Sequence, residues 1–494
     1  MSIITYNLPA LVVALPLLMA AVIALIPSRR VAWVLTLMTV ISVTFAAYGN
    51  ALMTIGASVS YELGGWPPPW GIEFITDGAS RVMAIIIASL SLVSTLYAKP
   101  LIEKEIHLDD IPRTYAAWLL TIGGMMGLVM TADAFNLFVF LEISSLSAVT
   151  LVAMGAGVDR RALMAAFNYL IIGAIGATFY VIGVGFCYAV TGTLNMADLA
   201  TRLPEATSAP VVVGLAFMAT GMMVKAAAFP VHMWLPAAYS YAPSAVSSLL
   251  SAVATKAAIY VLARILFTVF GGLEDVTGLI MTWVLIPLSI LAMFAGTILA
   301  IFEHDLKKML AQSSIAQIGY ITLALGIGTT ATVTAGFIHM VNHAMIKGGL
   351  FMAVGALAVT LGRRANLASI TGLGRAMPIT TSALLVCGFS LIGLPLTAGF
   401  ISKIYLISAL LDEGQGVITA LVLLSSALSV VYLWKMIEVM WMRPAPEGTK
   451  IQENPWMYGP VWVLAVANII FGVYATPVVA LARDAAMALM GGGA

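Results

Sequence analysis

The sequence is dominated by apolar stretches that are long enough to cross a membrane as helices. A bilayer core needs about 17–25 apolar residues per helix, and a scan with that length predicts fourteen spans. Their expected bounds are 8–27, 31–56, 80–98, 115–131, 134–154, 167–192, 210–229, 243–271, 280–302, 312–328, 333–360, 380–411, 416–442 and 458–482. The segments between them are short, so the pattern predicts an all-α integral membrane protein without a soluble domain.

Basic residues are spread unevenly over the loops between these spans. The loops after even-numbered helices hold Arg202 alone. The loops after odd-numbered helices hold Arg29, Arg30, Lys99, Lys104, Arg113, Arg160, Arg161, Lys307, Lys308, Arg363, Arg364, Arg375, Arg443 and Lys450. Because Lys and Arg are enriched in cytoplasmic loops, both termini of this multi-pass protein are expected on the extracytoplasmic side of the cell inner (plasma) membrane. The first stretch has no basic region before it and is interpreted as a retained span.

Composition narrows the function classes further. The 494 residues are 61% hydrophobic and 9% charged, whereas a soluble domain has roughly 25% charged residues. The net charge of +1 gives no electrostatic basis for binding nucleic acid. Cys187 and Cys387 lie in apolar segments without metal-ligand spacing and are interpreted as core residues. No haem, flavin, nucleotide or Fe–S ligand pattern is present, so we expect no cofactor and no enzymatic activity of the chain by itself.

Two of the predicted helices are interrupted in similar ways. The seventh carries Lys225 just before a break at Phe229-Pro230, and the twelfth carries Lys403 just after Gly393-Leu394-Pro395. The two helices are five apart, and a five-helix unit ends on the opposite side of the membrane from its start. A second copy is therefore inverted. Paired broken helices in inverted halves point to a transport site at the middle of the membrane.

Ionisable residues inside the spans are the candidate functional groups, because a charge there is costly unless it is used. Glu142 lies in the fifth helix, Lys225 in the seventh and Lys256 in the eighth. Glu142 beside Lys225 stabilises the ammonium, whereas a lysine separated from its partner tends to release its proton. Lysine suits such a switch better than arginine, which stays charged. The alternative is a static buried ion pair that only positions two helices.

The eleventh helix carries His339, His343 and Lys347, each four residues after the last. A step of four residues advances about 40° and about 6 Å along a helix, so the three groups form a stripe about 12 Å long. Histidine titrates near neutral pH and can pass protons; inert polar packing and metal binding are the alternatives. Lys403 follows the break of the twelfth helix and is expected to load the last proton, unless it snorkels to the interface.

Three further residues are weaker candidates. His232 lies close to the break of the seventh helix, where it could relay protons or cap exposed backbone. Lys435 and Glu438 are three residues apart on the thirteenth helix, and an ordinary helical ion pair explains them as well as a function does.

These residues lie in segments that resemble a known family, the antiporter-like subunits of the respiratory complex I superfamily, and most closely the D-type subunit of Mrp-type Na+/H+ antiporters. The resemblance covers nearly the whole chain. It depends on DAFNLFVFLE at 133–142, KAAAFPVHMWLP at 225–236, APS at 242–244, DLKKMLAQSSIAQIGY at 305–320, HMVNHAMIKGGLF at 339–351 and GLPLTAGFISK at 393–403.

The resemblance implies fourteen helices with two inverted five-helix repeats, helices 4–8 and 9–13, in which helices 7 and 12 are broken. The chain then divides into the first three helices (1–114), the first repeat (115–271), the second repeat (280–442) and a last helix (443–494). The resemblance also implies a polar axis at mid-membrane depth, formed by Glu142, Lys225, Lys256, His339, His343, Lys347 and Lys403.

The expected function is that of a proton-translocating subunit in a multi-subunit Na+/H+ antiporter, working with other membrane subunits. The main alternative is a proton-pumping subunit of a redox-driven complex, such as complex I or a membrane-bound hydrogenase. A redox enzyme in its own right lacks ligand motifs, and a purely structural scaffold leaves the buried lysines unexplained.

Overall fold

The computed structural model describes residues 6–206, 208–444 and 451–491. Lys450, one of the basic loop residues of the charge pattern, lies outside these residues. Within them, ten helices are long and apolar enough to cross a membrane, and three shorter apolar helices, Leu8–Ala24, Ala209–Lys225 and Pro378–Ile392, accompany them. The chain is therefore a mostly helical membrane protein, while the number of fourteen spans stays a prediction.

The first described elements are three helices and a small hairpin. The helices are α2 (Leu8–Ala24), α3 (Arg29–Met53) and α4 (Gly78–Glu105). Between α3 and α4, strands β1 (Val59–Glu62) and β2 (Glu73–Thr76) pair antiparallel, with Val59 opposite Thr76. The prediction of an all-α chain was wrong at this point, because β-branched and aromatic residues such as Tyr61 and Phe74 favour a strand over a short loop.

The next part of the chain holds the first broken helix. Its elements are α5 (Ile111–Met130), α6 (Ala134–Ala153), α7 (Arg161–Thr191), α8 (Met196–Arg202), α9 (Ala209–Lys225), α10 (Trp234–Tyr241) and α11 (Ser244–Ala263). The break separates α9 from α10, and Lys225 is the last residue of α9. Ala227 adopts a left-handed conformation there, and Pro230 has no N–H to continue a helix. The predicted interruption of the seventh helix is confirmed.

The second half of the chain also contains long helices and a break. It contains α12 (Glu274–Ile280), α13 (Ile286–Phe302), α14 (Leu306–Ile327), α15 (Thr330–Leu361), α16 (Leu373–Ala376), α17 (Pro378–Ile392), α18 (Ala398–Asp412) and α19 (Gly416–Ile437). Gly393 ends α17 in the left-handed conformation that commonly terminates helices. Pro395 then lies in the gap before α18, so the predicted interruption of the twelfth helix is confirmed as well.

Two helices close the chain where one was predicted. They are α20 (Pro455–Val473) and α21 (Thr476–Leu489). The prediction of a single span over 458–482 was wrong, because proline in the first turn of α21 is tolerated at the start of a helix and not in its interior.

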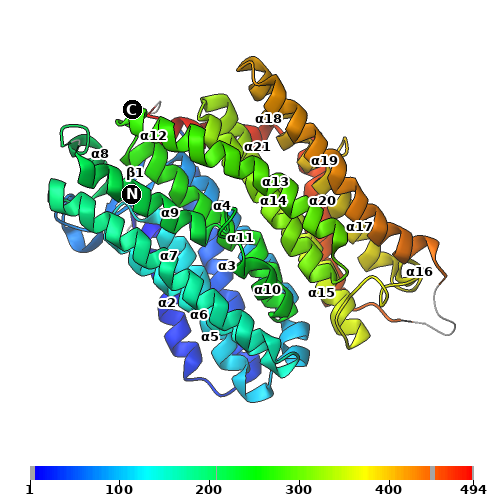
Figure 1. The fold of residues 1–494 in the computed structure, drawn as a ribbon. Helices are drawn as coiled ribbons and strands as arrows, with labels where there is room; N and C mark the ends of the chain where they lie inside the picture. The colour runs from blue at the N-terminus through cyan, green and yellow to red at the C-terminus, as the bar shows by residue number, and fades with distance from the viewer. Residues whose placement is uncertain (1–5, 207, 445–450, 492–494) are drawn as a thin grey trace.

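The arrangement places α11, α14 and α15 in the interior, between the two halves of the chain. Figure 1 shows α6 and α7 on one flank and α17, α18 and α19 on the other. Nearly every residue of α11 and α14 is buried, as is most of α15. Helices that are buried on all sides offer no surface to lipid, so ionisable side chains on them face protein.

The close approach at the second break makes a prediction about Gly399. A methyl group added to Gly399 would lie 1.8 Å from the carbonyl oxygen of Ser390. Because overpacking usually costs about 1–3 kcal/mol, we expect Gly399→Ala to lower the midpoint of thermal unfolding in detergent, measured by size-exclusion chromatography of heated samples. Gly416→Ala is the matched control, since its methyl group meets no atom within 4 Å. Unchanged thermal stability of the Gly399 variant would contradict the close approach.

Candidate functional site

The first part of the predicted polar axis lies where α6 passes the end of α9. Lys225 Nζ donates a hydrogen bond of 2.6 Å to Ser145 Oγ and lies 4.0 Å from Glu142 Oε1. The Lys225 side chain is 8% exposed and that of Glu142 is 26% exposed. A neighbouring cavity of about 40 Å3, lined in part by Ser144 and Tyr169, is large enough to admit water. Lys225 and Glu142 are therefore brought together, with a serine hydroxyl as the closer partner.

The middle of the axis lies on the interior helices. Lys256 on α11 is 1% exposed and donates to the carbonyl oxygen of Ser251. Lys347 on α15 is fully buried and donates hydrogen bonds to two groups on α14. These are Ser313 Oγ and the carbonyl oxygen of Leu310, the latter at a distance of 2.9 Å. The two amines thus come from opposite halves of the chain, on helices α11 and α15, which pack against each other in the interior.

The two imidazoles extend this path along α15. His339 and His343 stack with ring centroids 6.0 Å apart and planes 5° apart. His339 Nδ1 lies 2.8 Å from Ser402 Oγ, and His339 Nε2 lies 3.0 Å from Gln317 Oε1. Neither nitrogen of His343 has a hydrogen-bond partner among the residues described. Both rings are buried and point to protein, not lipid.

Lys403 lies at the far end of the axis, where α17 stops. Its ammonium donates to the carbonyl oxygens of Leu391 at 3.1 Å and Ile392 at 2.6 Å, and to Ser426 Oγ at 2.7 Å. It also lies 5.5 Å from the ring centroid of Tyr320. The carboxyl end of a helix carries partial negative charge, so the broken helix itself stabilises the ammonium. Lys403 is buried and does not snorkel to the interface.

The three weaker candidates lie away from this axis or have structural partners. His232 is buried in the first break and stacks on Phe229 at 5.2 Å. Lys435 donates a hydrogen bond of 2.6 Å to the carbonyl oxygen of Ile301, near the end of α13. Glu438 pairs instead with Arg443 at 2.9 Å. The alternative of a helical Lys435–Glu438 ion pair is therefore wrong, because each side chain finds a partner elsewhere.

Sequence reasoning missed the neutral partners of the axis. These are Ser145, Ser313, Gln317, Ser402 and Ser426. Serine is common in membrane helices, so one serine gives little signal. Two of them did carry a positional signal, since Ser145 lies three residues after Glu142 and Ser402 directly precedes Lys403.

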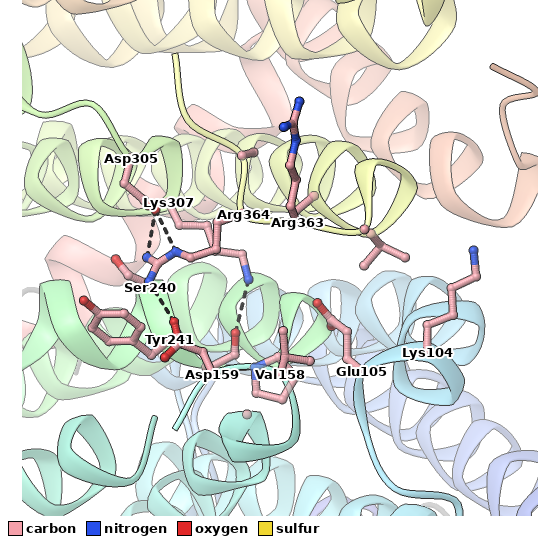
Figure 2. Close-up of a pocket in the computed structure, with 17 residues that line it drawn as sticks. Lys104, Glu105, Val158, Asp159, Ser240, Tyr241, Asp305, Lys307, Arg363 and Arg364 are labelled. Carbon is pink, nitrogen blue, oxygen red and sulfur yellow. Dashed lines mark hydrogen bonds and ion pairs between the residues drawn. The ribbon is translucent and has the colours of Figure 1, made fainter. Parts of the chain in front are cut away.

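A cavity of about 220 Å3 lies between the two halves, at the end of the bundle where α11 and α14 begin. Figure 2 shows Arg364 directed toward Asp305 and Asp159. Its guanidinium lies 2.8 Å from Asp305 Oδ2, 3.2 Å from Asp159 Oδ2 and 4.4 Å from the ring centroid of Tyr241. A hydrogen bond from Arg161, with further help from Arg364, lowers the pKa of Asp159 to about 2. This network joins the halves on the side predicted to be cytoplasmic.

The same cavity also adjoins the start of α11. The Glu105 carboxylate accepts hydrogen bonds from the backbone N–H and the hydroxyl of Ser244, each 2.7 Å long. A carboxylate at a helix N-terminus is stabilised by the helix dipole. Within the described part of the chain, no group of three or more His, Cys, Asp or Glu side chains could hold a metal ion.

Comparison with known proteins gives this geometry a family. The family model described as "NADH:quinone oxidoreductase/Mrp antiporter, TM" matches residues 131–429. NADH-quinone oxidoreductase subunit N of Desulforudis audaxviator is 37% identical over 95% of this chain and 96% of its own length.

Two solved structures share the fold over almost the full length. A chain of the Mrp complex from Dietzia sp. matches with a TM-score of 0.90 at 26% identity, covering 99% of this chain and 98% of its own. A chain of the archaeal membrane-bound sulfane sulfur reductase matches with a TM-score of 0.89 at 33% identity, covering 98% of both chains. The protein therefore belongs to the family of transmembrane antiporter-like subunits that NADH:quinone oxidoreductases and Mrp antiporters share.

Proposed function

We propose that the chain is the proton-translocating subunit of a multi-subunit Na+/H+ antiporter in the cell membrane. Protons pass from the Glu142–Lys225 pair to Lys256, along Lys347 and the two histidines of α15, and on to Lys403. The chain is by itself a transport subunit and not an enzyme, and it works together with other membrane subunits. The likeness to a chain of the Mrp complex, with a TM-score of 0.90, supports the choice of antiporter.

The observation that carries the proposal is the kind of partner that the buried lysines have. Within the described residues, Lys256, Lys347 and Lys403 bind only carbonyl oxygens and serine hydroxyls, and no carboxylate lies within ion-pair distance of them. Burying an ammonium without a counter-ion is costly. A group that is held by neutral partners in such a place can alternate between its charged and neutral forms, which a proton chain requires.

The Glu142–Lys225 pair supplies the switch at the start of the chain. At 4.0 Å the carboxylate is at the limit of ion-pair distance, while Ser145 holds the ammonium at 2.6 Å. Glu142 and Ser145 lie on the same helix, α6, so a change in the Glu142 side-chain conformation makes or breaks the pair while Ser145 still holds Lys225. Moving one charge across 100 mV is worth about 2.3 kcal/mol, so pairing of modest strength is enough to couple proton movement to a membrane potential.

The proposal includes an architecture of fourteen spans and two inverted five-helix repeats, with both termini outside. Two breaks that each contain a non-glycine residue with positive φ, Ala227 and Leu396, support the repeat. So does a second pair of features. Asp133 and Asp305 cap α6 and α14, and each forms an isolated antiparallel bridge, to Asn195 and Asn366 respectively.

The role of Lys225 can be separated from a purely structural one by replacing it with arginine. We expect Lys225→Arg to assemble normally and to lose nearly all transport, because arginine preserves the positive charge but does not release its proton. Lys225→Ala should be equally inactive. Transport is measured in inside-out vesicles as Na+-induced collapse of a pH gradient, followed with a fluorescent amine dye.

Lys435→Arg is the matched control, because Lys435 is only half-buried and lies outside the proposed proton chain. It should transport at the normal rate. A Lys225→Arg variant that transports as fast as the unaltered protein would mean that the pair is a static ion pair, and the proposed proton chain would have to be abandoned.

A second candidate function is that of a proton-pumping subunit in a redox-driven complex. The identities of 37% to an NADH-quinone oxidoreductase subunit and 33% to a chain of a sulfane sulfur reductase favour it. The proton chain is the same in both functions and only the source of energy differs.

The two functions predict different responses in the same vesicles. If the complex is an antiporter, Na+ added without any electron donor collapses an imposed pH gradient. If it is a redox pump, Na+ has no effect and an electron donor creates a pH gradient that Lys225→Arg abolishes. A gradient that forms only on electron flow would exclude the antiporter.

A further inference from the structure

Each of the two ring nitrogens of His339 has a polar partner, unlike those of the neighbouring His343 among the described residues. The Gln317 side-chain oxygen lies 3.0 Å from Nε2 and the Ser402 hydroxyl lies 2.8 Å from Nδ1. An amide oxygen only accepts hydrogen bonds, so Nε2 carries a hydrogen in both the neutral and the charged ring. Nδ1 is then the nitrogen that gains or loses a proton, and it faces Ser402.

The hydroxyl of Ser402 can satisfy His339 in both charge states. Its oxygen lies 2.8 Å from His339 Nδ1 and 3.1 Å from the carbonyl oxygen of Gly399. A serine hydroxyl has one hydrogen to donate and can also accept. With a neutral ring it donates to Nδ1; with an imidazolium it accepts from Nδ1–H and turns its own hydrogen to Gly399. Both ring nitrogens of His339 and the Ser402 hydroxyl therefore have a partner in both cases.

The neighbouring groups lack this adaptability. His343 stacks on His339, yet neither of its nitrogens has a hydrogen-bond partner among the described residues. An unpartnered imidazolium in the interior is costly. The ring centroid of Tyr320 lies 5.8 Å from the ring centroid of His339. It lies 5.5 Å from Lys403 Nζ. The face of that ring offers no hydrogen-bonding atom between imidazole and amine.

We propose that Ser402 is a positioning residue of the proton chain, whose hydroxyl reverses its hydrogen bond when His339 takes up a proton. His339 is then the station at which a proton rests before it reaches Lys403, and Gln317 keeps the exchanging nitrogen turned toward α18. The inference depends on the proposed proton-translocating function. It adds to it a residue that holds the charge of His339 without carrying a charge of its own.

The first test is transport by the full assembly with Ser402→Ala. Loss of a hydrogen bond to a charged group predicts a rate roughly ten- to hundredfold lower. Ser402→Thr keeps the hydroxyl and should restore most of the rate. Ser289→Ala is the matched control. Ser289 is similarly buried, and its hydroxyl bonds to Thr322, which is not part of the proposed proton chain. Transport by Ser402→Ala at the unaltered rate overturns the proposal.

The second test reads the histidine directly. Nitrogen-15 NMR of the histidine-labelled assembly in lipid should show a neutral His339 protonated at Nε2, with His339→Gln used to assign its signals. Gln317→Met removes the acceptor at His339 Nε2 and should therefore give a mixture of both tautomers. This variant also tests the proposal if Ser402→Ala does not assemble. A neutral His339 protonated at Nδ1 in the unaltered protein, or an unchanged tautomer in Gln317→Met, contradicts the proposal.

These outcomes separate the inference from the proposed function. If Lys225→Arg is inactive and Ser402→Ala is fully active, the proton chain stands and the role of Ser402 is refuted. If both variants transport normally, the proton chain itself is refuted and the role of Ser402 falls with it.

Discussion

Within the membrane, the carbonyl oxygens at the end of a half-helix and the ammonium group of a lysine each need a partner from the protein. In this fold the lysines at the two breaks and the carbonyl ends of the half-helices stabilise each other. Lys403 binds the last two carbonyl oxygens of α17, and Lys225 is itself the last residue of α9, where the helix dipole favours a cation. Trp234 binds the Val224 carbonyl of the first break through its indole N–H. The breaks and the lysines thus depend on one another.

Four further partners of the proposed proton chain are the hydroxyl groups of Ser145, Ser313, Ser402 and Ser426, and their neutrality has a consequence. A carboxylate would hold each ammonium in its charged form and leave an uncompensated buried charge once the lysine became neutral. A hydroxyl can accept from an ammonium and donate to a neutral amine or imidazole. Serine partners therefore permit both charge states at Lys347 and Lys403. Among the described residues, Lys225 alone of the four lysines of the axis has a carboxylate within ion-pair distance. Under the proposed function, charge is therefore controlled in the first half.

Sequence reasoning located the large features because their signals are chemical and independent of contacts. Apolar length predicted most of the long helices, and the rarity of charge in apolar segments singled out Glu142, the lysines and the histidines. It failed at one local signal, because a mainly apolar stretch hid the proline that divides α20 from α21. It also failed where tertiary contacts decide, since Gln317 becomes a partner of His339 only because α14 packs against α15. Lys435 was equally conspicuous in the sequence, yet its partner at the end of α13 lies 134 residues away.

The proposed repeat explains why the two halves present different groups to a similar position. Ser145 and Gln317 each lie twelve residues after the aspartate that caps their helix, Asp133 and Asp305. In the first half this position contacts Lys225, and in the second it contacts His339. A neutral polar side chain at that place can bind either an ammonium or an imidazole. The same backbone scaffold can therefore hold a lysine that is switched by a carboxylate in one half and a histidine that is held by neutral groups in the other.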